Sequence, residues 1–462
     1  MTSLDQKLKS VLGEAGFASG RDISEKHACD WSGFKACAPA VLLRPNTSAQ
    51  VSQVLALCNE HTQAIVVQGG LTGLVGGATP QAGEYALSLE RMSGIEELDT
   101  SSMTMTALAG TPLQSLQHSA AKQGLFMPLD LGARGSCTIG GNVATNAGGT
   151  EVIRYGMTRS IVLGLEVVLA DGTILSSMNK MIKNNTGYDL KQLFIGSEGT
   201  LGIVTKVVVQ LQPQQLNTQS AICTLESYDK VVELLSKLKQ GLGSGLTAFE
   251  LMWANYYHKS LQLQPSLTDP FAGQISDTLP FYLLVEYKDN DLKNGGEQFA
   301  SVLHQQIENG LIRDAVIAKN HQDTEKFWQI RDGIGELLQT ESEISNQDIS
   351  LPISKIGEFS TTIERVLRHK FDNIEVHFFG HIGDSNLHIC AYTGKADDLH
   401  DISANIMQIT GEFEGAVSAE HGIGVVKKKY LPLSRSDAEI AVMKNIKQAL
   451  DPKGILNKGR VI

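Results

Sequence analysis

The sequence has no apolar run of about 18 residues, which is the length that a helix needs to span a bilayer. It has only 12 prolines and 19% charged residues, so the composition fits neither a disordered chain nor a collagen-like one. Acidic residues outnumber basic ones by 50 to 39, and the one tight basic run is Lys427-Lys428-Lys429. We therefore expect no membrane-spanning helix and no nucleic-acid partner.

The six cysteines form no Cys-x-x-Cys pair and no zinc-finger spacing. A chain of 462 residues can bury a large core without disulfides, so we expect free thiols and a reducing compartment. The N-terminal residues lack the apolar stretch of a signal peptide and the Arg-rich character of a transit peptide. These features favour a cytoplasmic protein.

The chain length predicts about three domain-sized units or two large ones, at roughly 150 residues each. Hydrophobic periodicity predicts helices over 49–63 and 113–123, strands over 64–67, 103–109 and 203–211, and a hairpin over 162–175 around Asp171-Gly172. The Gln- and Pro-rich segment 212–215 then indicates a domain boundary.

Beyond this boundary the pattern predicts an α+β domain whose sheet is covered on one face. The expected strands are 220–225, 247–252, 281–287 and 314–318; the expected helices are 228–239, 291–309, 321–340 and 354–368. Residues 262–280 carry three prolines and are expected to form a loop. A last helix over about 436–449 is expected to end before Asp451-Pro452-Lys453-Gly454.

Glycine is abundant, with 45 residues against a typical share of about 7%, and it is clustered. One cluster, Gly69-Gly70-Leu71-Thr72-Gly73-Leu74-Val75-Gly76-Gly77, follows an expected strand, where successive backbone N–H groups can bind an anion. It matches neither the GxGxxG dinucleotide motif nor the P-loop. A second cluster, 128–149, combines glycine with short hydroxyl and amide side chains, as suits a flat cofactor lying against backbone. For both clusters, a purely structural turn is the alternative.

These loops, together with Asn185-Thr186-Gly187-Tyr188-Asp189-Leu190 and Gly196-Ser197-Glu198-Gly199-Thr200-Leu201-Gly202, resemble the FAD-linked oxidases of the vanillyl-alcohol oxidase type. Within that family the chain is most similar to the D-2-hydroxyglutarate dehydrogenase group, and beyond it to D-lactate dehydrogenases and glycolate oxidase subunits. The similarity runs from about residue 35 to 458. It implies an α+β fold: a two-part FAD-binding domain of the PCMH type over 1–214, a substrate domain with an antiparallel sheet over 215–420, and a C-terminal segment, 421–462, packing back towards the flavin.

The resemblance implies noncovalent FAD, because Leu71 stands where several relatives carry the histidine that bonds the flavin. The implied flavin residues are Gln68, Gly69, Gly70, Leu71, Thr72, Gly73, Gly76, Gly77, Pro128, Leu129, Gly132, Ser136, Gly140, Gly141, Asn142, Ala144, Thr145, Asn146, Gly148, Glu198, Gly199, Gly202, Ile203 and Asn457.

A histidine-rich segment lies in the C-terminal third. Apolar residues alternate on both sides of Gly383-Asp384-Ser385, which predicts a hairpin. If Asp384-Ser385 is a two-residue loop, His381 pairs with His388 and the two Cβ atoms lie roughly 5 Å apart, close enough to share a metal. Glu420 offers a third ligand. A hydrogen-bonded histidine pair without metal is the alternative.

Here too the resemblance assigns roles: His381, His388 and Glu420 bind a divalent metal, and His421 is the general base and contacts substrate. Zinc is the first expectation, with manganese, iron and cobalt as alternatives. Arg331 is the expected carboxylate clamp, and Asn386 an additional substrate contact. His377 matches no family position.

The expected reaction is metal-assisted oxidation of a D-2-hydroxy acid, first of all D-2-hydroxyglutarate, to the 2-oxo acid, with hydride transfer to flavin N5. With no nicotinamide motif, the electrons are expected to pass to an electron-transfer flavoprotein, a quinone or a cytochrome. Gly335 and Asn346 replace a threonine and a lysine of the hydroxyglutarate pattern, so D-lactate, D-malate or another D-2-hydroxy acid stays open.

Three other functions stay open: an oxidase of the same fold that uses O₂, a metal hydrolase built on the histidines, and a flavin-binding structural subunit. A homodimer is possible.

Overall fold

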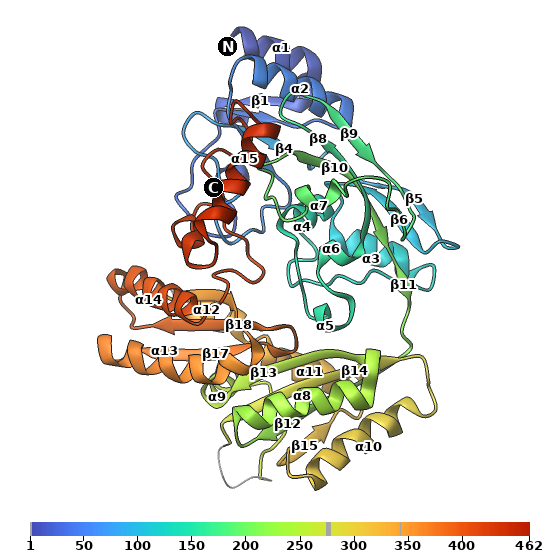
Figure 1. Ribbon diagram of the computed structural model, residues 1–462, viewed down its shortest axis with the longest axis vertical. Coiled ribbons are helices and arrows are strands. Elements are labelled where there is room, and N and C mark those ends of the chain that lie inside the picture. The colour runs from blue at the N-terminus through green and yellow to red at the C-terminus, as the bar shows by residue number, and fades with distance from the viewer. Residues whose placement is uncertain (1, 274–278, 342) are drawn as a thin grey trace. The chain divides into compact units, whose positions relative to one another are not determined.

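A computed structural model describes residues 2–273, 279–341 and 343–462 (Figure 1). The chain forms two compact units. The first comprises Met1–Gly149, Tyr155–Gln214 and Glu420–Ile462; the second comprises Thr150–Arg154 and Gln215–Ala419. Each unit therefore contains chain segments that are distant in sequence.

The first unit opens with a four-stranded sheet of order β1-β2-β4-β3, in which β2 and β3 both run parallel to β4. Its strands are β1 (Phe17–Ser19), β2 (Val41–Leu43), β3 (Ile65–Gln68) and β4 (Tyr85–Ser88). Helices α1 (Ser3–Leu12) and α2 (Ser48–Glu60) pack together beside it. Leu456 forms an isolated bridge with Ile65, so the C-terminal segment runs along β3.

The second sheet of this unit is antiparallel, with the order β5-β6-β10-β8-β9. Its strands are β5 (Ile95–Asp99), β6 (Thr104–Leu108), β8 (Val162–Val168), β9 (Ile174–Ser177) and β10 (Ile203–Gln210). The predicted hairpin is confirmed as β8–β9, and Gly172 in its turn has φ +91°.

The first unit also contains elements outside its two sheets. These are the pair β7 (Leu125–Phe126) and β11 (Gln212–Pro213), and the helices α3 (Leu113–Ala121), α4 (Ile139–Thr145), α6 (Thr158–Ile161), α7 (Lys191–Phe194) and α15 (Asp437–Leu450). Helix α5 (Val152–Tyr155) includes the end of the short segment that joins the second unit.

The second unit is built on a seven-stranded antiparallel sheet of order β15-β12-β14-β13-β17-β18-β16. Its strands are β12 (Asn217–Leu225), β13 (Leu246–Trp253), β14 (Phe281–Asp289), β15 (Asp314–Ile317), β16 (Ser345–Ser350), β17 (Glu375–His381) and β18 (Asn386–Tyr392). Strands over all four predicted ranges are confirmed.

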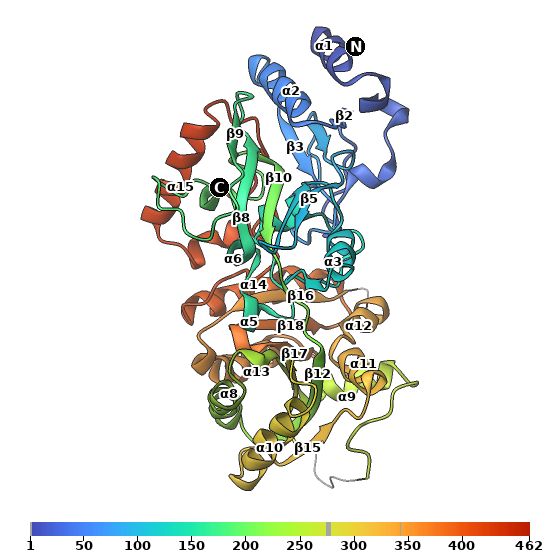
Figure 2. The same cartoon turned by 90° about the vertical axis from the view of Figure 1, so that its right-hand side faces the viewer.

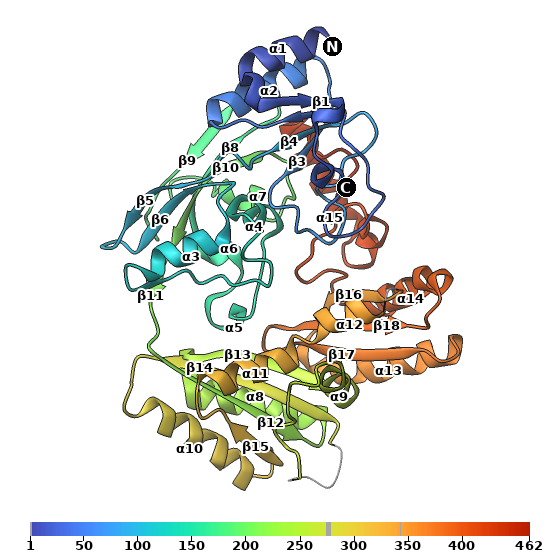
Figure 3. The ribbon, with the colours of Figure 1, turned by 180° about the vertical axis from the view of Figure 1, so that it is seen from behind.

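The prediction that one face of this sheet is covered is wrong, because helices cover both. Side chains alternate between faces along a strand, and every residue of β18 is buried. In Figure 2, α8 (Tyr228–Leu242), α10 (Gly295–Glu308) and α13 (Ile356–Lys370) lie on one side of the strands. The other side carries α9 (Ala254–Leu263), α11 (His321–Arg331) and α12 (Ile334–Thr340). Figure 3 shows these helices in the view opposite to that of Figure 1. Helix α14 (Leu399–Glu412) packs on α13 and β16.

Two element predictions in the second unit need correction. The helix expected over 321–340 is two helices, α11 and α12, because the chain leaves the helical path at Asp332 and Gly333. The loop expected over 262–280 begins with the last two residues of α9. This helix, which buries Tyr256 and Tyr257, was not predicted from the sequence. Residues 274–278 of that loop lie outside the described residues.

Candidate functional site

The first glycine loop leaves β3 and packs directly on the second. A Cβ atom on Gly70 would lie 2.1 Å from the carbonyl oxygen of Ser136, and one on Gly69 would lie 2.7 Å from Thr138 Oγ1. Real Cβ atoms do not approach backbone atoms so closely, so position 70 requires glycine, whereas the close neighbour at position 69 is a side-chain hydroxyl. The predicted flavin loops are thus brought together by backbone contact.

Two buried polar atoms beside this contact have no hydrogen-bond partner within the part of the chain that the structure describes. They are Thr138 Oγ1 and Asn142 Oδ1, whose residues are 7% and 4% exposed. Buried polar groups in proteins are almost always paired. A donor and acceptor left over here fit a bound cofactor with polar edges, such as a flavin nucleotide.

The third glycine loop joins the same region through Glu198 and the C-terminal Asn457. The Glu198 N–H donates to Ala144 O at 2.7 Å, and the Asn457 amide donates to Glu198 O at 2.6 Å and accepts the Val67 N–H at 2.8 Å. The Glu198 carboxylate accepts backbone N–H groups of Ile423 and Gly424. Burial raises the pKa of Glu198, and these two hydrogen bonds oppose that shift only in part.

Some predicted flavin residues make hydrogen bonds or packing contacts within the protein. The Gln68 amide is bonded to His27 and Ala78, and Gly202 lies where a Cβ would be 2.6 Å from Val167, next to the buried Ile203. Leu129 is part of the hydrophobic core. The remaining predicted flavin residues lie along the three loops: Leu71, Thr72, Gly73, Gly76, Gly77, Pro128, Gly132, Gly140, Gly141, Thr145, Asn146, Gly148 and Gly199.

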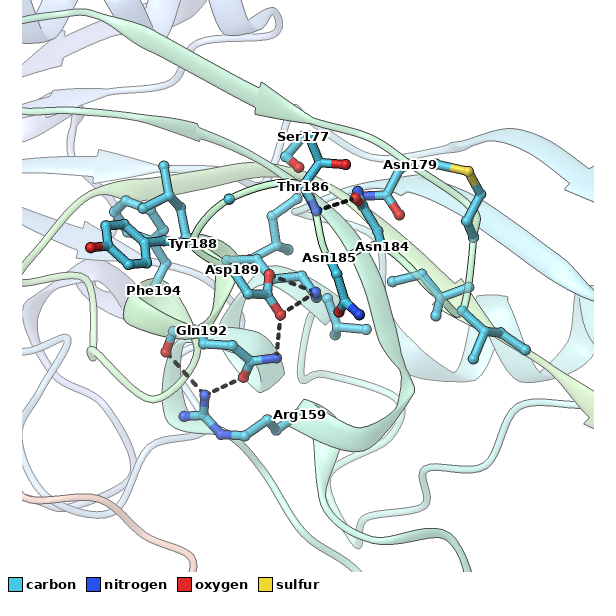
Figure 4. Close-up of a pocket in the computed structure, with 18 of the residues that line it drawn as sticks. Arg159, Ser177, Asn179, Asn184, Asn185, Thr186, Tyr188, Asp189, Gln192 and Phe194 are labelled. Atoms are coloured by element: carbon cyan, nitrogen blue, oxygen red, sulfur yellow. Dashed lines mark hydrogen bonds and ion pairs between the residues drawn. The ribbon is translucent and has the colours of Figure 1, made fainter.

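The segment Asn185–Leu190, one of those that resemble the FAD-linked oxidases, borders a separate pocket of about 620 Å³ (Figure 4). Amide and hydroxyl side chains from this segment line it together with residues of β8 and β9. Arg159 enters the pocket and donates to Gln192 Oε1 at 2.6 Å, while its backbone N–H donates to Asn146 Oδ1 at 2.9 Å. The pocket is therefore linked to the second glycine loop through Arg159.

The predicted metal ligands form a compact cluster. His381, His388 and Glu420 each offer one ligand atom, and these atoms all lie within 4.8 Å of one another. Both histidines are buried, and Glu420 directly follows Ala419, the last residue of the second unit. Two imidazoles and a carboxylate are a donor set that suits a divalent transition metal with a coordination position left open. These residues therefore fit the expected metal.

The pairing that we predicted for the two histidines is wrong by two residues. Ile382–Asp384 form a 3₁₀ turn and Ser385 has φ +79°, so the connection is longer than a two-residue loop, and His388 pairs with Phe379. A shift of two residues keeps both side chains on the same face, because the side-chain period of a strand is two. Their ring centroids lie 5.4 Å apart.

A buried carboxylate that sequence reasoning missed, Glu250, lies opposite His381 in the register of β13 and β17. Its Oε1 accepts from His381 Nδ1 at 2.7 Å, and its Oε2 accepts from Arg331 Nε at 2.8 Å. Burial alone would raise the pKa of Glu250, but the charges of His381 and Arg331 bring it down to about 2. Arg331, 6% exposed, also places Nη2 at 3.0 Å from His381 Nε2. The predicted carboxylate clamp and metal ligand thus share one carboxylate.

Asn386 lies on the same face of β18 as His388 and is 3% exposed. Neither its amide nitrogen nor its carbonyl oxygen has a hydrogen-bond partner among the described residues. Such an unpaired, buried amide is costly unless a ligand completes it. This position fits the predicted substrate contact.

A second missed carboxylate, Asp348, lies opposite His388 in the register of β16 and β18 and is fully buried. Its Oδ2 accepts the Ala419 N–H at 3.1 Å, immediately before Glu420 and the predicted base His421. Register is a long-range property, so neither Glu250 nor Asp348 carries a local signal that could have revealed it. His377, as expected, is outside the cluster and contacts Glu375.

The two positions that depart from the hydroxyglutarate pattern differ in surroundings. Gly335, in α12, has open space where a Cβ would lie. Asn346 lies two residues before Asp348 on β16, hence on the same face, and its Oδ1 accepts from Cys390 Sγ at 3.6 Å.

All six cysteines are free, as predicted. Within the described ranges, no helix is both long enough and apolar enough to cross a membrane.

Comparisons with known proteins match both parts of the chain. Residues 39–177 match the model of an FAD binding domain, and 214–461 match that of FAD linked oxidases, C-terminal domain. The mitochondrial D-2-hydroxyglutarate dehydrogenase of Arabidopsis thaliana is 39% identical over 100% of this chain and 82% of its own length. The D-2-hydroxyglutarate dehydrogenase of Stutzerimonas stutzeri (strain A1501) is 34% identical over 99% of this chain and 98% of its own.

Solved structures show the same fold at low identity. A p-cresol methylhydroxylase with substrate bound superposes with a TM-score of 0.76 at 17% identity, covering 99% of this chain and 96% of that one. An alkyldihydroxyacetonephosphate synthase superposes with a TM-score of 0.77 at 15% identity, covering 99% of this chain and 85% of that one. From the two matched domains and the full-length relatives, the chain is an FAD-linked oxidoreductase and belongs to the FAD-linked oxidase family.

Proposed function

We propose that this protein oxidises a D-2-hydroxy acid, with D-2-hydroxyglutarate as the first candidate, to the corresponding 2-oxo acid. The observation that carries the proposal is the cluster of His381, His388 and Glu420, with the buried guanidinium of Arg331 against His381. The names and identities of the relatives support the choice of substrate.

When bound, FAD supplies the acceptor for the C2 hydride, and a divalent metal, first of all zinc and otherwise manganese, iron or cobalt, supplies a Lewis acid for the hydroxyl. We assign the metal to His381, His388 and Glu420, and FAD to the three glycine loops with Asn457. Leu71 offers no group for a covalent bond to the flavin, so the cofactor is expected to be released on denaturation.

The chain's own side chains then have distinct tasks. We assign the Nη groups of Arg331 to the C1 carboxylate; its Nε is bonded to Glu250, Nη1 lies 3.2 Å from Asp332 Oδ1 and Nη2 lies 3.0 Å from His381 Nε2. The unpaired amide of Asn386 can bind a second substrate oxygen. His421, in its neutral form, takes the hydroxyl proton on a ring nitrogen, and the electron pair left on the oxygen forms the C=O bond as the hydride leaves C2.

The residues for recognising the distal carboxylate of hydroxyglutarate depart from the hydroxyglutarate pattern, since Asn346 stands in place of a lysine. An amide donates hydrogen bonds but carries no charge, so we expect weaker binding of the second carboxylate than a cation would allow. The electrons are proposed to pass to an electron-transfer flavoprotein, a quinone or a cytochrome. A cytoplasmic homodimer stays a prediction.

The test is anaerobic titration of the purified, zinc-loaded protein with both enantiomers of 2-hydroxyglutarate, lactate and malate. We expect bleaching of the flavin absorbance by D-2-hydroxyglutarate and none by its L-enantiomer. Bleaching by D-lactate or D-malate alone would keep the reaction and replace the substrate. Flavin that no hydroxy acid reduces would refute the proposal, and rapid turnover on O₂ without an added acceptor would make the protein an oxidase.

A further inference from the structure

One face of the second unit's sheet gathers buried polar side chains from four neighbouring strands. Glu250 is on β13, His381 on β17, His388 on β18 and Asp348 on β16. The same face also carries Asn346 and Asn386, and its apolar residues Met252, Phe379 and Cys390 pack against α9, α11 and α12. A carboxylate placed in such surroundings must be hydrogen-bonded to charged or polar partners.

The two oxygens of Glu250 have separate partners. Oε1 accepts from Nδ1 of His381, and Oε2 accepts from Nε of Arg331. Glu250 is 1% exposed, so water does not compete for either oxygen. Because Nδ1 of His381 donates to Glu250, the ring's lone pair is on Nε2, which faces Arg331 Nη2 at 3.0 Å, and Nε2 is therefore the atom that we assign to the metal.

The bond to Arg331 has a matching consequence. It fixes the guanidinium through Nε, so the plane of Nη1 and Nη2 is set by the sheet rather than by the flexible side chain. The backbone of Arg331 is held too, since Tyr256 Oη donates to its carbonyl oxygen at 2.6 Å. A guanidinium held in this way loses less conformational freedom when it binds a carboxylate.

We propose that Glu250 is a positioning residue that sets the metal-binding nitrogen of His381 and the carboxylate-binding plane of Arg331 at the same time. This inference rests on the proposed function for the roles of those two residues. It adds that metal affinity and substrate affinity are coupled through one buried carboxylate, 131 residues from His381 in the sequence.

The variant Glu250→Gln separates this role from that of an ordinary buried ion pair. A glutamine has one acceptor oxygen, so it can accept from His381 or from Arg331, and its NH₂ group meets the donor of the other. Glu250→Asp keeps the carboxylate on a shorter stem and serves as the conservative variant. The matched control is Glu286→Gln, because Glu286 is a buried carboxylate of the next strand, β14, bonded to Trp328 and Lys288.

The measurement is Zn²⁺ affinity by chelator competition, together with the visible spectrum of the Co²⁺-loaded protein. For Glu250→Gln we expect Zn²⁺ affinity about 10–100-fold below wild type and an altered Co²⁺ spectrum, with bound flavin unchanged. We also expect a higher half-saturation concentration for flavin reduction by D-2-hydroxyglutarate. Glu286→Gln should match wild type in all of these, and Glu250→Asp should recover part of the affinity.

Wild-type Zn²⁺ affinity and Co²⁺ spectrum in Glu250→Gln would overturn the inference and leave the proposed function standing. If Glu250→Gln does not fold, Glu250→Asp decides: an unchanged Co²⁺ spectrum and Zn²⁺ affinity would then overturn it. A wild-type protein that binds neither Zn²⁺ nor Co²⁺ would overturn both the inference and the metal assignment of the proposed function.

Discussion

At the scale of single residues, the candidate sites are marked by side chains that the protein itself does not complete. Asn386 has both ends of a buried amide unpaired, and Thr138 and Asn142 each have one unpaired oxygen in the glycine loops. Leaving such groups buried costs about 1–3 kcal/mol each, so a fold retains them where a ligand supplies the missing partner. These residues occur at both predicted cofactor positions.

The metal assignment makes a prediction for His381→Ala. Removing one of three ligands should strip the metal and abolish flavin reduction, while flavin stays bound. The measurement is metal content by elemental analysis beside the flavin absorbance. His377→Ala is the control, since His377 is also buried on β17 but lies outside the ligand cluster. Retention of stoichiometric metal by His381→Ala would remove this residue from the site.

The close contact of the glycine loops makes a second prediction. Gly70→Ala should lower the flavin content at least tenfold, because the new methyl would overlap Ser136 O and force the two loops apart. Gly335→Ala is the matched control, because Gly335 lies outside the flavin loops and a Cβ there meets nothing within 4 Å. We would compare the ratio of flavin to protein absorbance in the two variants; equal ratios would show that the close approach does not matter for binding.

At the scale of elements, strand alternation explains why polar residues from distant segments share one face. His381 and His388 are on β17 and β18, and Glu250 and Asp348 are on the strands outside them. Our pairing of the two histidines was wrong, yet their common face was predicted, because an error of two residues preserves the face. An error of one would have put one histidine on the opposite face of the sheet.

Asp348 is expected to hold the segment that carries Glu420. Ser350 and Ala416 exchange two backbone hydrogen bonds, and Asp348 then accepts the Ala419 N–H. Asp348→Ala should therefore lower Zn²⁺ affinity by about tenfold, as loss of an outer partner does at metal sites. Chelator competition tests this, with Gln347→Ala, whose side chain points to the opposite face, as the control. Equal affinities in the two variants would contradict it.

Helix α1 provides a pH-dependent prediction. Thr2 and Asp5 form a capping box, and Tyr85 Oη donates to Asp5 Oδ1 at 2.6 Å. Burial raises the pKa of Asp5, but the hydrogen bonds from Tyr85 and Thr2 together lower it by more than burial raises it. The pKa of Asp5 therefore lies below its ordinary value of 3.8. A carboxylate whose pKa is lower in the folded state than in the unfolded state stabilises the fold at pH values above the unfolded pKa. This stabilisation is lost as the pH falls through the folded-state pKa.

Tyr85→Phe should thus destabilise the first unit by about 1–2 kcal/mol at neutral pH, through loss of a hydrogen bond to a charged group. The difference from wild type should shrink as the pH falls below 3.8 and through the lowered pKa of Asp5 in the folded state, where the carboxyl becomes protonated. Thermal unfolding as a function of pH on the acid side measures it. A difference that does not change as Asp5 becomes protonated would show that the tyrosine does not act through the Asp5 charge.

At the scale of the whole molecule, the flavin loops and the two proposed histidine ligands lie in different units. The three glycine loops and Asn457 belong to the first unit, as does Glu420, whereas His381 and His388 belong to the second. We therefore expect the two losses to be independent: Gly70→Ala should keep its metal, and His381→Ala should keep its flavin. Measuring both cofactors in both variants tests this, and loss of both from either one would show that the sites depend on each other for folding.

The sequence alone determined the family, the fold class, most helices and strands, and the grouping of His381, His388 and Glu420. These features are encoded by periodicity, by glycine clusters and by motifs within short stretches of chain, where the physical constraint is between near neighbours. The tertiary structure alone decided the register of β17 with β18, the break between α11 and α12, and the covering of both sheet faces. It also revealed Glu250 and Asp348, because a buried carboxylate acquires its role from the strand that lies beside it, and that neighbour can be more than a hundred residues away in the sequence.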